Sequence, residues 1–166
     1  MSEHSPAQLL DSVLDQMLEG LQILSPDWTY LYVNETVAQQ AHTTKEELTG
    51  KKFTELYPEA LKTELFATME RVMQTRSSER MENEFSFPDG SSGWFQLFIH
   101  PCDEGILILS LDISEQVKLR EKLDDSLQKL DTLMDAAITR EKRMIELKEV
   151  IRQIWEQLRN FGQETV

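Results

Sequence analysis

Residues 94–115, WFQLFIHPCDEGILILSLDISE, constrain the fold of this chain more than any other stretch. The part before the turn at 101–105 alternates its side chains with a period of two, which predicts a strand. The part after the turn, 106–111, is apolar on both faces, so this second strand has to be covered on both faces. We expect one cover from helices of the same domain. The other should come from a flanking helix or from a second copy of the chain.

The second strand is followed almost directly by a helix. Asp112-Ile113-Ser114-Glu115 changes the pattern from strand to helix, and Ser114 is predicted to cap a helix that begins at Glu115. The Asp112 carboxylate is expected to accept backbone N–H groups or to pair with a base, which would fix the angle at which the helix leaves the sheet. A simple helix cap is the alternative. Because the connection has little slack, a disturbance of the sheet should reach the helix.

Charge is distributed unevenly along the chain. Residues 1–115 contain 7 Lys and Arg against 20 Asp and Glu, whereas residues 116–160 contain 10 against 9. An acidic body repels phosphate backbones, so we expect no nucleic-acid binding. No apolar run approaches the roughly 20 residues that span a bilayer, and MSEHSPAQ lacks the layout of a signal peptide. One cysteine, Cys102, excludes an internal disulfide and a thiolate metal cluster, and a cytoplasmic location is the simplest prediction.

The chain before residue 94 is predicted to form a helix, two strands, a group of helices and a third strand. Ser5-Pro6 starts the first helix, and Gly20 ends it. Its apolar row, a candidate cover for the outer face of the sheet, consists of Leu10, Val13, Leu14, Met17 and Leu18. Asn34 ends the second strand and is expected to play a local role as a helix cap. The expected strands are 21–24, 29–33 and 81–87, and the expected helical segments are 36–41, 44–48, 53–57 and 60–76.

This order of elements, with its residues, resembles a PAS domain, the small sensory module of bacterial signalling proteins. The motifs that carry the resemblance are Tyr32-Val33-Asn34 before a helix, Leu48-Thr49-Gly50-Lys51, the Pro88-Asp89-Gly90 hairpin that leads to Trp94-Phe95, and Asp112-Ile113-Ser114-Glu115. The last is similar to the Asp-Ile-Thr junction by which the family joins its sheet to an output helix. The resemblance covers about residues 8–118 and makes Asn34, Asp112 and Ser114 candidate junction residues.

The resemblance implies an α+β fold with a five-stranded antiparallel sheet and helices on one face. We expect a flanking helix in residues 1–20, the PAS domain in 21–115 and a coiled-coil signalling helix in 116–161. The family's pocket lies between sheet and helices, so any ligand should lie among the residues predicted to face the core. These are Ile23, Leu31, Val33, Val37, Phe53, Leu56, Leu65, Met69, Phe95, Leu97, Leu107 and Leu109.

The sequence requires no cofactor. Light-sensing relatives carry a flavin-reactive cysteine in a helical motif that residues 35–42 lack, although a flavin bound without a covalent bond needs no such motif. Haem-binding relatives place a histidine on the long helix, and residues 60–76 contain none, so haem is not expected. His42 could serve only as an unusual haem ligand. Cys102 is expected to be a thiol in a turn.

Residues 116–160 contain neither proline nor glycine and are predicted to form one long helix. Apolar residues follow the four-three spacing of a coiled coil, with a change of frame within 138–144 that gives the helix two competing registers. The predicted row that faces the partner helix consists of Leu123, Leu127, Leu130, Met134, Ala137, Met144, Leu147, Ile151, Ile154 and Leu158, and it extends to Phe161. We expect a parallel homodimer. A helix packed on its own domain is the alternative.

No catalytic constellation accompanies these elements. The predicted long helix has no phosphoacceptor histidine, and the chain has no glycine-rich nucleotide loop, so no enzymatic activity is expected. The first hypothesis is a sensor or adaptor that dimerises and signals to a partner, such as a kinase or regulator of a two-component system. The second is the sensory region of a larger histidine kinase or cyclic-dinucleotide enzyme. A dimerisation scaffold without a ligand is the third.

Overall fold

The computed structural model describes residues 5–163, and the side chains of residues 5–160. The chain divides after Val117 into two units. In order, the elements are α1 (Pro6–Leu14), β1 (Gly20–Leu24), β2 (Tyr30–Val33), α2 (Glu35–Gln40), α3 (Lys45–Leu48), α4 (Phe53–Leu56), the 3₁₀ helix η1 (Pro58–Lys62), α5 (Glu64–Thr75), β3 (Glu79–Ser86), β4 (Ser92–Cys102), β5 (Gly105–Asp112) and α6 (Ser114–Gln163).

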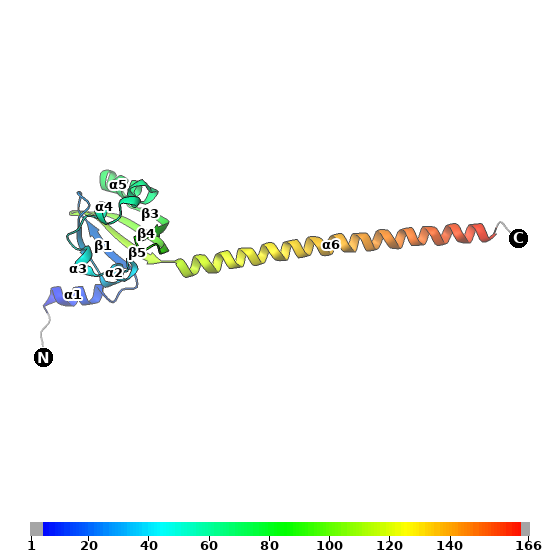
Figure 1. Ribbon diagram of the computed structural model, residues 1–166, viewed down its shortest axis with the longest axis horizontal. Helices are drawn as coiled ribbons and strands as arrows, with labels where there is room; N and C mark the ends of the chain where they lie inside the picture. The colour runs from blue at the N-terminus through cyan, green and yellow to red at the C-terminus, as the bar shows by residue number, and fades with distance from the viewer. Residues whose placement is uncertain (1–4, 164–166) are drawn as a thin grey trace, which may run out of the picture. The chain divides into compact units, whose positions relative to one another are not determined.

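The first unit is built on a five-stranded antiparallel sheet with the order β2-β1-β5-β4-β3 (Figure 1). β3, β4 and β5 are consecutive hairpin neighbours, whereas β1 crosses to lie beside β5, the last strand made. The helical segments between β2 and β3 pack on one face of the sheet, where residues of α2, α4 and α5 join the hydrophobic core. The predicted α+β fold with five antiparallel strands and a long C-terminal helix is confirmed.

The face that β5 turns to the core differs from the prediction. Ile106 and Ile108 are buried there, while Leu107 and Leu109 lie on the opposite, partly exposed face. The strand register explains which side chains of β5 face the core. Ser110 is paired with the buried Leu97 of β4, and paired residues share a face, so Ile106 and Ile108 lie on that face too. Leu107 is in turn paired with Ile23, which therefore also lies on the outer face, and Leu31 is 45% exposed. The predicted core positions Ile23, Leu31, Leu107 and Leu109 are corrected accordingly.

The first helix is shorter than predicted and docks through polar groups. It ends at Leu14, so the expected continuation to Gly20 is wrong, and no residue of α1 is buried. Lys45 Nζ lies 3.0 Å from both carboxylate oxygens of Asp15 and 3.4 Å from Oδ1 of Asp11. The Tyr32 hydroxyl also donates to Asp11 over 2.8 Å. The acidic side of α1 therefore faces the domain, while Leu9, Leu10 and Val13 are exposed.

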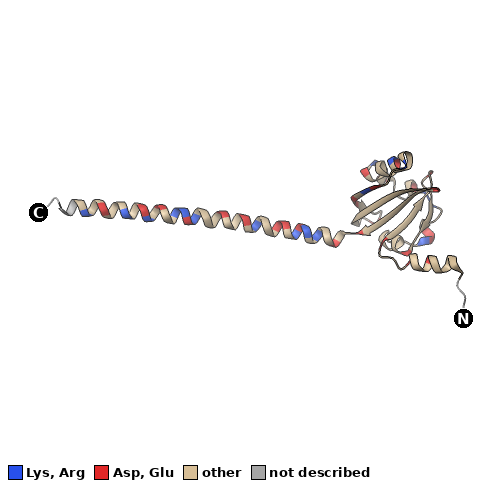
Figure 2. Cartoon of the chain, turned by 180° about the vertical axis from the view of Figure 1, so that it is seen from behind, with Lys and Arg blue, Asp and Glu red and all other residues tan. Residues whose placement is uncertain are grey.

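The second unit consists of the long helix. Lys and Arg alternate with Asp and Glu along its length (Figure 2), and its predicted apolar row is exposed to solvent in the single chain from Leu123 to Leu158.

In the first unit, the single helix expected over 60–76 is divided into η1 and α5 by Thr63, whose backbone is extended. Within residues 5–163, none of the helices combines the length and the apolar character that crossing a membrane requires.

Candidate ligand cavity and helix junction

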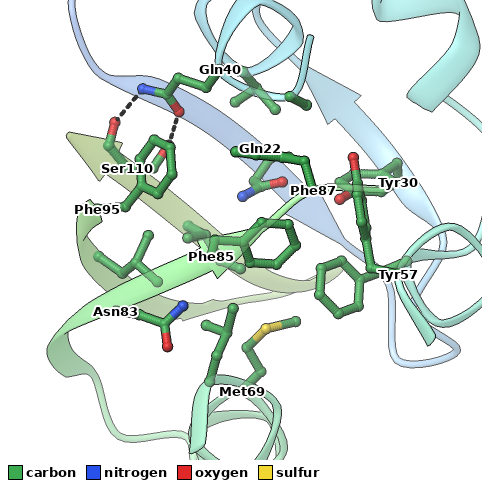
Figure 3. A pocket seen from close by; sticks show the side chains of 16 residues that line it. Gln22, Tyr30, Gln40, Tyr57, Met69, Asn83, Phe85, Phe87, Phe95 and Ser110 are labelled. Atoms are coloured by element: carbon green, nitrogen blue, oxygen red, sulfur yellow. Dashed lines mark hydrogen bonds between the residues drawn. The ribbon is translucent and has the colours of Figure 1, made fainter. Parts of the chain in front are cut away.

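A cavity of about 70 Å³ lies between the inner face of the sheet and the helices (Figure 3). Helices α2, α4 and α5 contribute one side, and all strands of the sheet contribute the other. Its lining residues are Gln22, Tyr30, Val37, Gln40, Ala41, Phe53, Tyr57, Leu65, Met69, Asn83, Phe85, Phe87, Phe95, Leu97, Ile108 and Ser110. None of these side chains carries a charge at neutral pH.

Four aromatic rings of the lining form a continuous belt along the cavity. The ring centroids of Tyr57 and Phe85 are 5.1 Å apart, those of Phe85 and Phe87 are 5.0 Å apart, and those of Phe87 and Phe95 are 6.1 Å apart. Such edge-to-face and tilted pairs stabilise one another beyond the apolar area that they bury. Burial raises the pKa of the Tyr57 hydroxyl, so this group stays protonated and keeps its hydrogen-bond donor.

Polar side chains gather at one end of the cavity. The Ser110 hydroxyl donates to Gln40 Oε1 over 2.6 Å, and Gln40 Nε2 donates to the Ser110 carbonyl oxygen over 3.2 Å (Figure 3). This pair fastens α2 to β5. A Cβ atom on Gly20 would lie 2.4 Å from the Ser110 hydroxyl and 2.6 Å from Gln40 Oε1, so the pair requires glycine at this position of β1. Gln22 and Asn83 add two more amides to the lining.

The structure brings half of the predicted pocket residues together. Val37, Phe53, Leu65, Met69, Phe95 and Leu97 line the cavity, whereas Val33 is buried in the core beside it. Leu56 lines a second cavity, described below, and the four residues corrected above line neither. The sequence reasoning missed the polar set Gln22, Gln40, Asn83 and Ser110. A signal was present, since Gln22 and Ser110 are polar residues inside otherwise apolar strands.

Asn34 connects four segments of the first unit. Its side chain is fully buried, and Oδ1 accepts from the N–H groups of Leu21 and Val37, over 2.9 and 3.1 Å. Nδ2 donates to the carbonyl oxygens of Leu14 and Glu19, over 2.8 and 3.0 Å. Asn34 therefore caps α2, as expected for a local role, and also holds the segment after α1 against β1.

At the same end of the sheet, where β1 begins and β5 ends, four residues join the sheet to the first turn of α6. Oδ1 of Asp112 accepts the N–H of Ser114 over 2.9 Å, which satisfies one of the helix's unpaired first donors. Ser114 begins α6 and does not cap it as predicted. Its hydroxyl instead accepts the N–H of Trp94 over 2.9 Å, because this donor lies where the ladder between β4 and β5 ends. The N–H of Ile113 donates to the Trp94 carbonyl oxygen over 2.8 Å.

Comparison with known families identifies this arrangement. A family model described as the PAS fold matches residues 14–118, which is more than half of the chain. The chain belongs to the PAS family. A search of the curated proteins gave no match to this PAS protein.

Solved structures support the same fold at low sequence identity. An RNA-binding light-oxygen-voltage receptor is 14% identical with a TM-score of 0.59; the match covers 77% of this PAS protein but only 40% of that chain. The PAS domain of a protein from Colwellia psychrerythraea is 14% identical with a TM-score of 0.56, over 67% of this chain and 99% of that one. A domain of a sensory box sensor histidine kinase/response regulator from Geobacter sulfurreducens is 18% identical with a TM-score of 0.53, over 64% and 93%.

A second cavity lies next to the first in the PAS domain, between the end of α2 and the β3–β4 hairpin. Ala41, Tyr57 and Phe87 line both cavities. At the rim, Nδ1 of His42 lies 2.9 Å from Asp89 Oδ2, and its ring lies 5.1 Å from that of Phe87. The Ser91 hydroxyl, then His42, holds the pKa of Asp89 well below its usual value, so this carboxylate stays ionised at neutral pH. The contact fastens the hairpin beside the cavity.

Replacing Asp89 by alanine should loosen this hairpin. The N–H of Phe87 donates to the Ser91 carbonyl oxygen over 2.8 Å, and we expect its hydrogen exchange to become about twofold to tenfold faster in Asp89→Ala, as for the loss of exposed hydrogen bonds. Asp103→Ala in the β4–β5 turn serves as a control and should leave this amide unchanged. Equal exchange at Phe87 in wild type and Asp89→Ala would show that Asp89 does not fasten the hairpin.

Proposed function

We propose that this chain is a non-catalytic sensor or adaptor module that dimerises through α6 and passes a signal to a partner protein in the cytoplasm. A kinase or a regulator of a two-component system is the kind of partner that this role requires. The observation that carries the proposal is the junction between the sheet and α6. β4 and β5 supply Phe95, Leu97, Ile108 and Ser110 to the cavity, and the same two strands bond directly to the first turn of α6.

This connection gives a physical route for a signal. A ligand that changes the spacing of β4 and β5 also changes the positions of Trp94 and Asp112. Both residues bind Ser114, at the start of α6, through hydrogen bonds of 2.9 Å. We propose that the chain has three functional parts. These are a flanking segment in 1–20, the PAS domain in 21–115 and the signalling helix in 116–161.

Pairing of α6 is supported by its exposed apolar row. Burying a leucine or isoleucine side chain contributes about 1.5–3 kcal/mol, and the row repeats such residues along the helix. We propose a parallel pair, because two sensory domains at the same end can act together on one output. The exposed apolar residues of α1, Leu9, Leu10 and Val13, would then lie near the dimer interface or over the outer face of the sheet.

Two alternatives keep the same module but differ from the sensor in whether it is attached to a catalytic domain and whether it binds a ligand. As the sensory region of a larger histidine kinase or cyclic-dinucleotide enzyme, the chain would keep the junction and the pairing and gain a catalytic domain. As a scaffold without a ligand, it would keep the pairing, and its own side chains would fill the core. Native mass spectrometry of the purified dimer detects a retained small molecule and separates the scaffold from the sensor. Visible absorbance of the same sample tests for a bound flavin.

The junction can be tested with engineered cross-links. In a Cys102→Ser background, Leu130→Cys and Ile151→Cys report the pairing of α6 on either side of the change in frame. Asp112→Ala removes the acceptor for the Ser114 N–H, and we expect it to leave fold and dimer intact while changing the ratio of the two cross-links severalfold. Asp103→Ala is the control. Unchanged cross-linking at both positions, together with a loss of partner output, would mean that Asp112 acts in another way.

A further inference from the structure

The chemistry of the first cavity narrows the class of ligand that it accepts. All sixteen lining residues are uncharged, so an anionic or cationic group inside it would lose its hydration without gaining a counter-ion. Transfer of an unpaired charge to such surroundings costs several kcal/mol or more. The lining therefore selects against carboxylates, phosphates and ammonium groups at the enclosed end. It favours a molecule without charge.

The polar end of the cavity supplies a specific hydrogen-bonding position. Gln40 and Ser110 are engaged with one another, and Asn83 Nδ2 donates to the Glu84 carbonyl oxygen, so among the lining amides Gln22 has the most unused capacity. The hydroxyls of Tyr30 and Tyr57 also line the cavity without a hydrogen bond to another lining residue. Gln22 makes no hydrogen bond to the other lining residues, and in Figure 3 its amide lies among them rather than outside. An amide has two N–H donors and one carbonyl acceptor, so it can bind a hydroxyl, a carbonyl or another amide. The aromatic belt then receives the apolar part of the same molecule.

The volume limits the size of the ligand. An apolar cavity of about 150 Å³ takes up benzene, and one water needs about 10–15 Å³. On these two scales, a cavity of about 70 Å³ holds roughly three to seven non-hydrogen atoms. A flavin ring system or a haem is far larger than this. The residues present also offer no cation for a flavin phosphate and no charged partner for haem propionates.

We propose that the cavity binds a small uncharged molecule with one hydrogen-bonding group, such as a short alcohol or amide, whose polar end bonds to Gln22 and whose apolar end packs on the aromatic belt. This inference deepens the proposed sensory function and rests on it. It does not involve the second cavity or the junction.

A matched pair of probes tests the proposal. Isobutyramide and isobutyrate have nearly the same shape, but only the second is charged at neutral pH. The protein is labelled with ¹³C-methyl methionine, so that Met69, which lines the cavity and is 1% exposed, reports binding, and Met134 on α6 serves as reference. We expect isobutyramide to shift the Met69 signal saturably, with isobutyrate at least tenfold weaker and Met134 unchanged. Riboflavin should leave Met69 unaffected.

Two variants locate the hydrogen bond. Gln22→Leu keeps the size of the side chain and should weaken isobutyramide binding roughly threefold to tenfold, which corresponds to one hydrogen bond. Gln96→Leu is the matched control, because Gln96 alternates with Phe95 and Leu97 and so faces away from the cavity. Equal binding of isobutyramide and isobutyrate, no saturable shift of Met69 with isobutyramide, or a saturable shift with riboflavin would each overturn the ligand class. If Gln22→Leu and Gln96→Leu weakened binding equally, the position of the polar end would be wrong.

These outcomes are separate from those of the cross-linking experiment. Binding of isobutyramide with cross-links that do not respond to Asp112→Ala would refute the signalling role and keep the ligand class. If the cross-links respond to Asp112→Ala but isobutyramide does not bind, the ligand class would be refuted and the signalling role kept.

Discussion

Asn34→Ala is expected to lower the free energy of unfolding by about 3 kcal/mol, because the substitution removes four hydrogen bonds from a fully buried side chain. Two backbone N–H groups and two carbonyl oxygens lose their partner at once. Some of these groups lie near the surface and can bind water, which keeps the loss below the sum of four fully buried groups. Urea denaturation followed by tryptophan fluorescence measures the change.

Asn83→Ala is the matched control for this prediction. The Asn83 side chain makes one hydrogen bond, from Nδ2 to the Glu84 carbonyl oxygen, and it is only partly buried. Its removal should change the free energy of unfolding by less than about 1 kcal/mol. If Asn34→Ala were no more destabilising than Asn83→Ala, the network around Asn34 would contribute little to stability, and its role would be confined to orienting the segment after α1.

Leu130→Glu should convert the proposed dimer into monomers. In a symmetric pair both copies of Leu130 are replaced, so the change removes about 3 kcal/mol or more of apolar burial and places two like charges opposite one another. The dissociation constant of the dimer is therefore expected to rise by at least about a hundredfold. Sedimentation equilibrium over a range of protein concentrations measures it.

Leu133→Glu provides the control on the same turn of α6. Leu133 is 66% exposed in the single chain, somewhat more than Leu130 at 55%, but it lies outside the predicted row. The Leu133→Glu substitution should therefore leave the dimer intact. A wild-type protein that sediments as a monomer at tens of micromolar would refute the pairing itself. Dissociation by Leu133→Glu but not by Leu130→Glu would instead mean that another face of α6 is paired.

The order of the elements could be predicted because local signals mark each boundary. Asn34 precedes α2, Gly90 lies in the β3–β4 hairpin with φ 86°, and Pro58 starts η1. Such signals act over a few residues, so the sequence alone contains them. The length of α1 was overestimated because its apolar row was expected to face the sheet. In the structure, the carboxylates of Asp11 and Asp15 determine how the helix docks.

The face of each strand was harder to predict, and the cavity depends on it. β5 is apolar on both faces, so alternation could not distinguish Ile108 from Leu109. In β1, the apolar Ile23 was preferred as the inner residue, whereas the structure turns Gln22 inward. Only the pairing between β1, β5 and β4 resolves the choice, and this pairing joins residues far apart in the sequence. The polar end of the cavity was missed for the same reason.

The strand order also sets the sequence of events during synthesis. β1 and β2 are made first, but β1 needs β5 as its second neighbour, so the sheet closes only when residues up to Asp112 are available. The 50 residues of α6 follow, and at 5–20 residues per second the ribosome needs about 3–10 s to make them. Mixed α/β domains of this size fold within about a second, so each sheet can close before its own helix is complete. The pairing of α6 that we propose would then join domains that have already folded, which would lower the risk that two nascent chains exchange strands.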